Sequence, residues 1–161
     1  MKNRTRALGA FLALSLALCT LPARAGSPEE DVAVVRAMLQ RWNQLDWEGV
    51  IMSFTEDGVL HSMMAEPIVG RDAIRTRLTK LSKGVEMIDL QLLQIGAGDG
   101  VVFTARHDRF RVNGHDGELP VAGVFTVRDG KISEWREYYD HASFLRELGA
   151  SETADASCSG N

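Results

Sequence analysis

Apolar and polar positions in the first half of the chain follow the period of helices. Ser27 can act as an N-cap, and a proline and two acidic residues follow it in the first turn. Apolar residues then recur three and four positions apart, which predicts an amphipathic helix up to about Leu45. A second, short helix is expected over 46–54, and a third begins at Gly70.

After Gly84 the apolar positions alternate with a period of two, which indicates strands. Asp-Gly and Asn-Gly pairs at 99, 113, 116 and 129 predict the turns between them. A short helix over 142–148 closes the domain. Because helices precede an antiparallel meander, the fold class is α+β, a curved sheet wrapped around N-terminal helices with an interior pocket. The expected strands are 59–63, 87–95, 100–112, 119–128 and 131–141.

The N-terminus has the three parts of a signal peptide. Lys2, Arg4 and Arg6 precede an apolar run over 7–21, and Ala-Arg-Ala follows at 23–25. The run is short for a bilayer, which takes about 20 apolar residues, so no stable membrane anchor is expected. We therefore expect a signal peptide over 1–25, a domain over 26–150, a disordered tail over 151–161, and an exported protein, periplasmic or secreted.

Charge and cysteine content exclude several functions for the mature chain. Loss of the four basic residues of the signal peptide leaves 14 of the 18 Lys and Arg residues against 22 Asp and Glu. Such an acidic surface repels phosphate backbones, so nucleic acid is a poor partner. Cys158 alone remains, in the polar tail, so no disulfide can stabilise the domain and its own role stays open. No zinc-ligand spacing or nucleotide-binding glycine motif is present.

Charged residues on two expected strands could carry chemistry. Alternation places Arg106 and Asp108 on one face among apolar neighbours. The last strand puts Trp135, Glu137 and Tyr139 on one face and Arg136, Tyr138 and Asp140 on the other, and hairpin pairing can bring Asp140 near Arg106. An Asp–Arg–Asp trio could keep one acid ionised and the other protonated, as general acid–base addition of water requires. An ordinary surface ion pair is the alternative interpretation of the same spacing.

Three short sequence motifs support a family resemblance. The stretches VFTARHD (102–108), GVF (123–125) and GKISEWREYYD (130–140) resemble the limonene-1,2-epoxide hydrolase family, a SnoaL-like branch of the nuclear-transport-factor-2-like (NTF2-like) superfamily. The resemblance covers residues 42–144 and implies a cone-shaped fold. It also implies a homodimer, because relatives of this kind pair sheet to sheet. It also implies that Asp140 takes a proton from water, that Asp108 donates one to the epoxide oxygen, and that Arg106 holds both acids. No metal or cofactor is required by that mechanism.

The resemblance also indicates where this chain departs from the family. The family holds the attacking water with a Tyr and an Asn on its first strand, and those positions are Leu60 and Ser62 here. A leucine cannot form hydrogen bonds, and a serine has no amide donors. The leading hypothesis is hydrolysis of a small apolar epoxide. A ligand-binding module without catalysis and an acid–base isomerase or dehydratase, with Tyr138 as the oxyanion donor, remain alternatives.

Overall fold

The computed structural model describes residues 26–149. The predicted signal peptide and the predicted tail with Cys158 lie outside the described residues. Within residues 26–149, no helix is long and apolar enough to cross a membrane.

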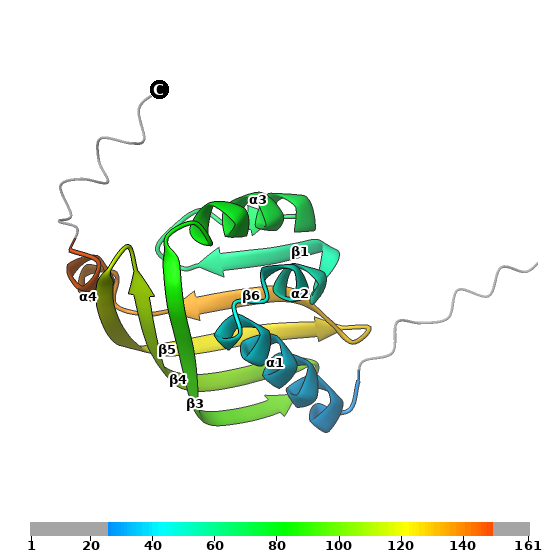
Figure 1. Ribbon diagram of the computed structural model, residues 1–161. Coiled ribbons are helices and arrows are strands. Elements are labelled where there is room, and N and C mark those ends of the chain that lie inside the picture. Colours follow the sequence, from blue (N-terminus) through cyan, green and yellow to red (C-terminus); the bar gives the residue numbers. More distant parts are fainter. Residues whose placement is uncertain (1–25, 150–161) are drawn as a thin grey trace, which may run out of the picture.

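Three helices cover one face of the sheet, and a fourth lies beside the end of β5 (Figure 1). Helix α1 begins with the predicted cap: the Ser27 hydroxyl accepts from Glu30 N–H, and the Glu30 carboxylate accepts from Ser27 N–H. Helix α3 follows Gly70, whose φ of 92° suits glycine. The helices are α1 (Pro28–Asn43), α2 (Trp47–Met52), α3 (Arg71–Leu81) and α4 (His141–Glu147).

Six strands form one sheet in the order β2-β1-β6-β5-β4-β3, in which only β1 and β6 run parallel. Irregular register at two places in β3 accompanies its strong bend, so that the sheet curves around α1 (Figure 1). The predicted α+β class is therefore confirmed. The strands are β1 (Phe54–Ser62), β2 (Ile68–Val69), β3 (Val85–Gly98), β4 (Val101–Val112), β5 (His115–Arg128) and β6 (Lys131–Tyr138).

The starts of β1 and β5 differ from the prediction for physical reasons. Strand β1 begins at Phe54, which is fully buried and pairs with β6. Strand β5 begins at His115, because Asn113 and Gly114 (φ 50° and 79°) already make a two-residue turn. Gly117 lies inside β5 where a Cβ would come within 2.5 Å of the Phe110 ring, so packing rather than a turn accounts for this glycine.

The core lies between the helices and the concave face of the sheet. Trp135 packs against Trp42, Phe54 and Phe125, with ring centroids 5.6, 6.4 and 5.1 Å away. A smaller cluster around Phe110 packs beneath α4. Between the two clusters lies a pocket that reaches the inner face of β4, β5 and β6.

Candidate active site

Four strands contribute neighbouring inward positions at the floor of the pocket. Ser62 of β1 pairs with Glu137 of β6, Glu137 with Gly123 of β5, and Gly123 with Thr104 of β4. Paired residues in a sheet point to the same face. The register therefore places a hydroxyl, a carboxyl, a gap and a second hydroxyl in one row across the sheet.

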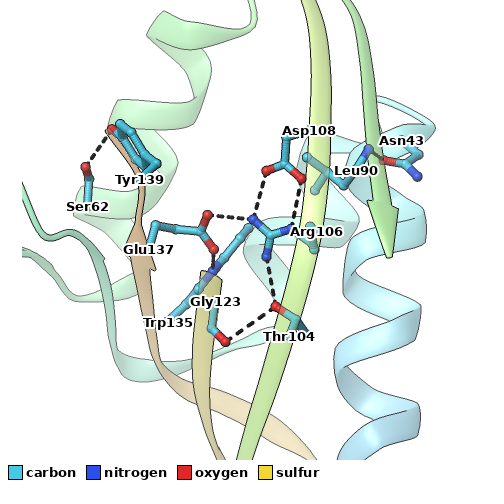
Figure 2. A network of polar contacts seen from close by, with 10 residues as sticks. All are labelled: Asn43, Ser62, Leu90, Thr104, Arg106, Asp108, Gly123, Trp135, Glu137 and Tyr139. Atoms are coloured by element: carbon cyan, nitrogen blue, oxygen red, sulfur yellow. Dashed lines mark hydrogen bonds and ion pairs between the residues drawn. The ribbon is translucent and has the colours of Figure 1, made fainter. Parts of the chain in front are cut away.

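Arg106 crosses this row and connects two carboxylates (Figure 2). Its Nε and Nη2 donate to the two oxygens of Asp108 at 3.0 and 2.9 Å, and Nη2 also donates to Glu137 Oε2 at 2.6 Å. Nη1 donates to Thr104 Oγ1 at 3.3 Å, and the guanidinium carbon lies 5.8 Å from the centre of the Trp135 ring. The arginine is only 2% exposed, so its position is fixed by these contacts.

Gly123 of β5 makes room for the guanidinium between β4 and β6. A Cβ at this position would lie 2.7 Å from Arg106 Nη1 and 2.7 Å from Thr104 Oγ1. Strand β5 separates the strand of Arg106 from the strand of Glu137, so the arginine must pass over β5 to reach the carboxylate. A glycine at this crossing therefore permits the contact.

Burial and neighbouring charge determine the protonation of the trio Arg106, Asp108 and Glu137. Desolvation raises the pKa of Glu137 to about 7, against the lowering effect of Arg106 and with a further rise from the Asp108 charge. Trp135 Nε1 also donates to Glu137 Oε1. Burial alone would lower the pKa of Arg106, but Glu137 and Asp108 outweigh it and the pKa ends above its ordinary value. The guanidinium therefore stays charged, while Glu137 can gain or lose a proton near neutral pH.

The pocket above the trio has a volume of about 280 Å³ and a mostly apolar wall. Leucine, isoleucine, valine and aromatic side chains from α3 and from all six strands line it. From β2, only Ile68 takes part. Besides the trio, the polar lining residues are Ser62, Tyr139, Glu66, Arg77 and Arg109. Ser62 Oγ lies 2.7 Å from Tyr139 Oη. Such a pocket suits a small apolar molecule with one polar, reactive end.

The structure brings together Arg106 and Asp108 as the sequence predicts, but it does not place Asp140 with them. Strand β6 ends at Tyr138, and Asp140 instead caps α4, accepting from Ser143 N–H at 2.5 Å. This backbone hydrogen bond holds the pKa of the exposed Asp140 carboxyl below its ordinary value. The predicted position of Asp140 is therefore wrong, and Glu137 is the second carboxylate bound to Arg106.

The alternation of β6 could have identified Glu137 from the sequence. Trp135 is large and apolar and has to face the core, so Glu137 and Tyr139 must face inward with it. The same alternation turns Tyr138 outward, where it is 40% exposed, so the structure does not support it as a donor inside the pocket. Leu60 and Ser62 do line the pocket, as their predicted roles require.

No metal site is evident in the described part of the chain. Among residues 26–149, no three His, Cys, Asp or Glu side chains are grouped so as to hold a metal ion.

Comparison with known proteins supports the resemblance seen in the sequence. The sequence model described as the limonene-1,2-epoxide hydrolase catalytic domain matches residues 29–149. The epoxide hydrolase EphG of Mycobacterium tuberculosis is 29% identical over 114 residues, which cover 71% of this chain and 76% of that protein.

Solved structures show the same fold. A limonene-1,2-epoxide-hydrolase-like epoxide hydrolase of M. tuberculosis superimposes with a TM-score of 0.69 at 26% identity, covering 83% of this chain and all of that one. A Shewanella denitrificans protein described as a SnoaL-like polyketide cyclase superimposes with a TM-score of 0.68 at 13% identity, covering 74% and 96%. The NTF2-like, SnoaL-like fold expected from the sequence is thereby confirmed.

Proposed function

The chain belongs to the limonene-1,2-epoxide hydrolase family, and from this premise we propose that it adds water to a small apolar epoxide, giving a vicinal diol. One observation carries the proposal beyond family membership. A buried arginine holds two carboxylates, Asp108 and Glu137, at the floor of an apolar pocket. Two carboxyl groups joined in this way can take one proton and give another in the same step.

In the proposed reaction, Glu137 is the general base and Asp108 the general acid. Glu137 accepts a proton from water as the water oxygen forms a bond to an epoxide carbon. The bond between that carbon and the epoxide oxygen breaks, and Asp108 gives its proton to that oxygen. The base is assigned to Glu137 because the hydroxyls of Ser62 and Tyr139 lie on its side of the trio, where a water could bind.

The reaction requires one proton on the carboxyl pair at its start. The raised pKa of Glu137, about 7, means that a buried pair beside Arg106 keeps one proton below neutral pH and releases it above. The proposed step starts from the form of the pair in which this proton is on Asp108 and Glu137 is ionised, and a proton transfer between the two acids supplies that form. Because the reaction leaves a proton on Glu137 and removes one from Asp108, a proton transfer between the two acids restores the starting form.

The substrate class follows from the pocket wall. Apolar side chains surround the trio, and the cavity of about 280 Å³ lies near the small end of the range for ligand pockets, roughly 300–1,000 Å³. An apolar body would leave water as it enters, and the epoxide oxygen would be the one polar atom facing Asp108. No cofactor takes part in the proposed reaction, and the partner is this small apolar substrate.

Binding without catalysis is the second candidate function. Leu60 lies at a position where the family has a water-binding tyrosine, and it offers no hydrogen bond. The same fold also occurs in a protein described as a polyketide cyclase, so the fold alone does not indicate a hydrolase. An acid–base isomerase has less support, because Tyr138, its expected oxyanion donor, faces away from the pocket.

Diol formation by variants separates these functions. We expect the wild-type protein to convert a small apolar epoxide to its diol, and Glu137→Gln to lower kcat by at least about 10³-fold, since an amide cannot accept the proton. Asp140→Asn is the matched control on the same segment and should keep wild-type rates. If Asp140→Asn removes activity and Glu137→Gln does not, the assignment is wrong. Ligand binding without any diol would favour the binding module.

We also propose that two copies pair through the outer face of the sheet. Phe103 and Tyr138 are 55% and 40% exposed there, with small side chains at Ala105 and Ala122 between them in the register. Sedimentation equilibrium should give a dimer for the wild type and a monomer for Phe103→Glu. A monomeric wild-type protein at micromolar concentration would contradict the homodimer.

Export is a further proposal from the sequence. Mass spectrometry of the protein from its natural host should find a mature N-terminus near Gly26. A native protein that retains Lys2 would contradict an exported, periplasmic or secreted location.

A further inference from the structure

Two hydroxyl groups meet in the pocket wall on one side of Glu137. Ser62 Oγ of β1 lies 2.7 Å from Tyr139 Oη, which comes from the segment directly after β6 (Figure 2). Ser62 is paired with Glu137 across the parallel β1–β6 contact, and Tyr139 is two residues beyond Glu137. Both hydroxyls therefore lie on the side of Glu137 that is opposite the guanidinium of Arg106.

The distances expected from sheet geometry suit a bridging water. Paired side chains on neighbouring strands start about 5 Å apart, and a water that bonds to two groups at about 2.8 Å each spans a similar gap. Each oxygen of Glu137 already accepts one hydrogen bond, from Arg106 and from Trp135, and each retains a lone pair. Glu137 can therefore accept from a water without losing either contact.

The hydrogen-bond count of the hydroxyl pair also leaves room for a water. Two hydroxyls have two protons and four lone pairs, and their mutual bond uses one of each. One O–H and three lone pairs remain and can bond to a water. One further residue that accepts a proton of this water completes the site. That residue is Glu137.

We propose that the Ser62–Tyr139 hydroxyl pair binds the water that Glu137 activates. The water donates one proton to Glu137, is held by the hydroxyl pair through a second hydrogen bond, and directs a lone pair at the epoxide carbon. This inference rests on the proposed function of Glu137 as the base. It assigns to Tyr139, from the end of β6, the hydroxyl that Leu60 cannot supply from β1.

The surroundings of Tyr139 hold its hydroxyl in place. The ring packs edge-on against Phe144, with centroids 5.4 Å apart, and lies 6.4 Å from the His141 ring. Both contacts come from α4, whose N-cap is Asp140. A ring held by two aromatic neighbours can position its hydroxyl for a water with little loss of freedom at the transition state.

Kinetics of matched variants test the water site. We expect Tyr139→Phe and Ser62→Ala each to lower kcat about 10- to 100-fold, with KM unchanged within about twofold, because substrate contacts remain while the water is misplaced. The double variant should cost little more than either single variant, since the two hydroxyls act on one water. Ser62→Thr, which keeps the hydroxyl, should retain most of the activity. Tyr138→Phe, which removes a hydroxyl outside the pocket, is the control.

A crystal structure of the unliganded protein gives a second readout that does not need turnover. We expect an ordered water within hydrogen-bond distance of Glu137 and of at least one of the two hydroxyls, and its loss in the Ser62→Ala, Tyr139→Phe double variant. If the wild type turns over no epoxide but the water is present and hydroxyl-dependent, the proposed function fails and the water site stands. If epoxide is hydrolysed but the single variants keep wild-type kcat, or the water persists in the double variant, the inference is wrong.

Discussion

Replacement of Glu137 by glutamine should remove a specific pH dependence from the stability of the protein. The carboxyl has an ordinary pKa of 4.5 when unfolded and a pKa of about 7 in the folded protein. A raised pKa means that the folded state holds the proton more tightly. The contribution of Glu137 to stability is therefore fully present below pH about 4.5 and is lost as the pH rises through about 7.

The size of this effect follows from the difference between the two pKa values. Each pKa unit corresponds to about 1.4 kcal/mol, so the full loss is on the order of 3 kcal/mol. Between pH 5 and pH 8 the expected loss is about 2 to 3 kcal/mol, because the unfolded carboxyl is already mostly ionised at pH 5. The side chain is 13% exposed, so solvent screens this effect only slightly.

The glutamine variant lacks the titration but introduces a constant cost. Its amide nitrogen would meet either Arg106 Nη2 or Trp135 Nε1, both of which are donors. An unsatisfied buried group of this kind costs about 1 to 3 kcal/mol, and this cost is the same at every pH. From pH 5 to pH 8 the wild type should therefore lose about 2 to 3 kcal/mol of unfolding free energy relative to the variant.

Urea unfolding at pH 5, 6, 7 and 8 measures this difference. Far-ultraviolet circular dichroism is the suitable signal, because Trp135 contacts the carboxyl and its fluorescence would report the titration itself. Glu134→Gln is the matched control, since Glu134 lies on the same strand with its side chain 35% exposed, outside the trio. If the difference for Glu137→Gln stays constant within about 0.5 kcal/mol over this range, the account of a buried, proton-holding Glu137 is refuted.

Three further results are expected from the site geometry. Above pH about 7 the value of kcat/KM should fall tenfold per pH unit as the carboxyl pair Asp108–Glu137 loses its one proton, and a rate that rises there would contradict the one-proton starting form. Gly123→Ala should lower kcat on the order of 100-fold, because the added Cβ displaces Arg106. Gly96→Ala is the control, since a Cβ there has no atom within 4 Å, and equal rates for both variants would refute the crossing of Arg106 over β5. Asp140→Ala should lower the midpoint of thermal unfolding through loss of the α4 cap while kcat stays within about twofold, and a large kcat loss would restore Asp140 to the site.

Much of the fold could be predicted because its signals are local. The capping box at Ser27, the change of period after Gly84 and the Asn113-Gly114 turn each depend on a few adjacent residues. The parallel pairing of β1 with β6 could not be predicted, because it joins residues more than 70 positions apart. It is this pairing that brings Ser62 beside Glu137.

The site was predicted in part for a similar reason. Arg106 and Asp108 are two residues apart on one strand, so alternation alone places them together. The second carboxylate depends on which face of β6 points inward, because Trp135 and Glu137 share one face and Asp140 falls on the other. A strand extended through 141 would include Asp140, whereas the observed end at Tyr138 leaves Asp140 free to cap α4. An aspartate directly before a helix, with a serine three positions on, is a cap signal that competes with the strand pattern.

The oxygen isotope of the diol formed in a single turnover tests the central claim most directly. With protein in excess over a small apolar epoxide in H₂¹⁸O, direct attack by water places ¹⁸O in every diol molecule in the first turnover and leaves the carboxylates of Asp108 and Glu137 unlabelled. An enzyme carboxylate that attacked the epoxide would transfer its own ¹⁶O to the diol first and acquire ¹⁸O itself. We expect fully labelled diol from the wild type and diol formation at least about 10³-fold slower from Glu137→Gln. Unlabelled diol in the first turnover, or label in the protein, would contradict it.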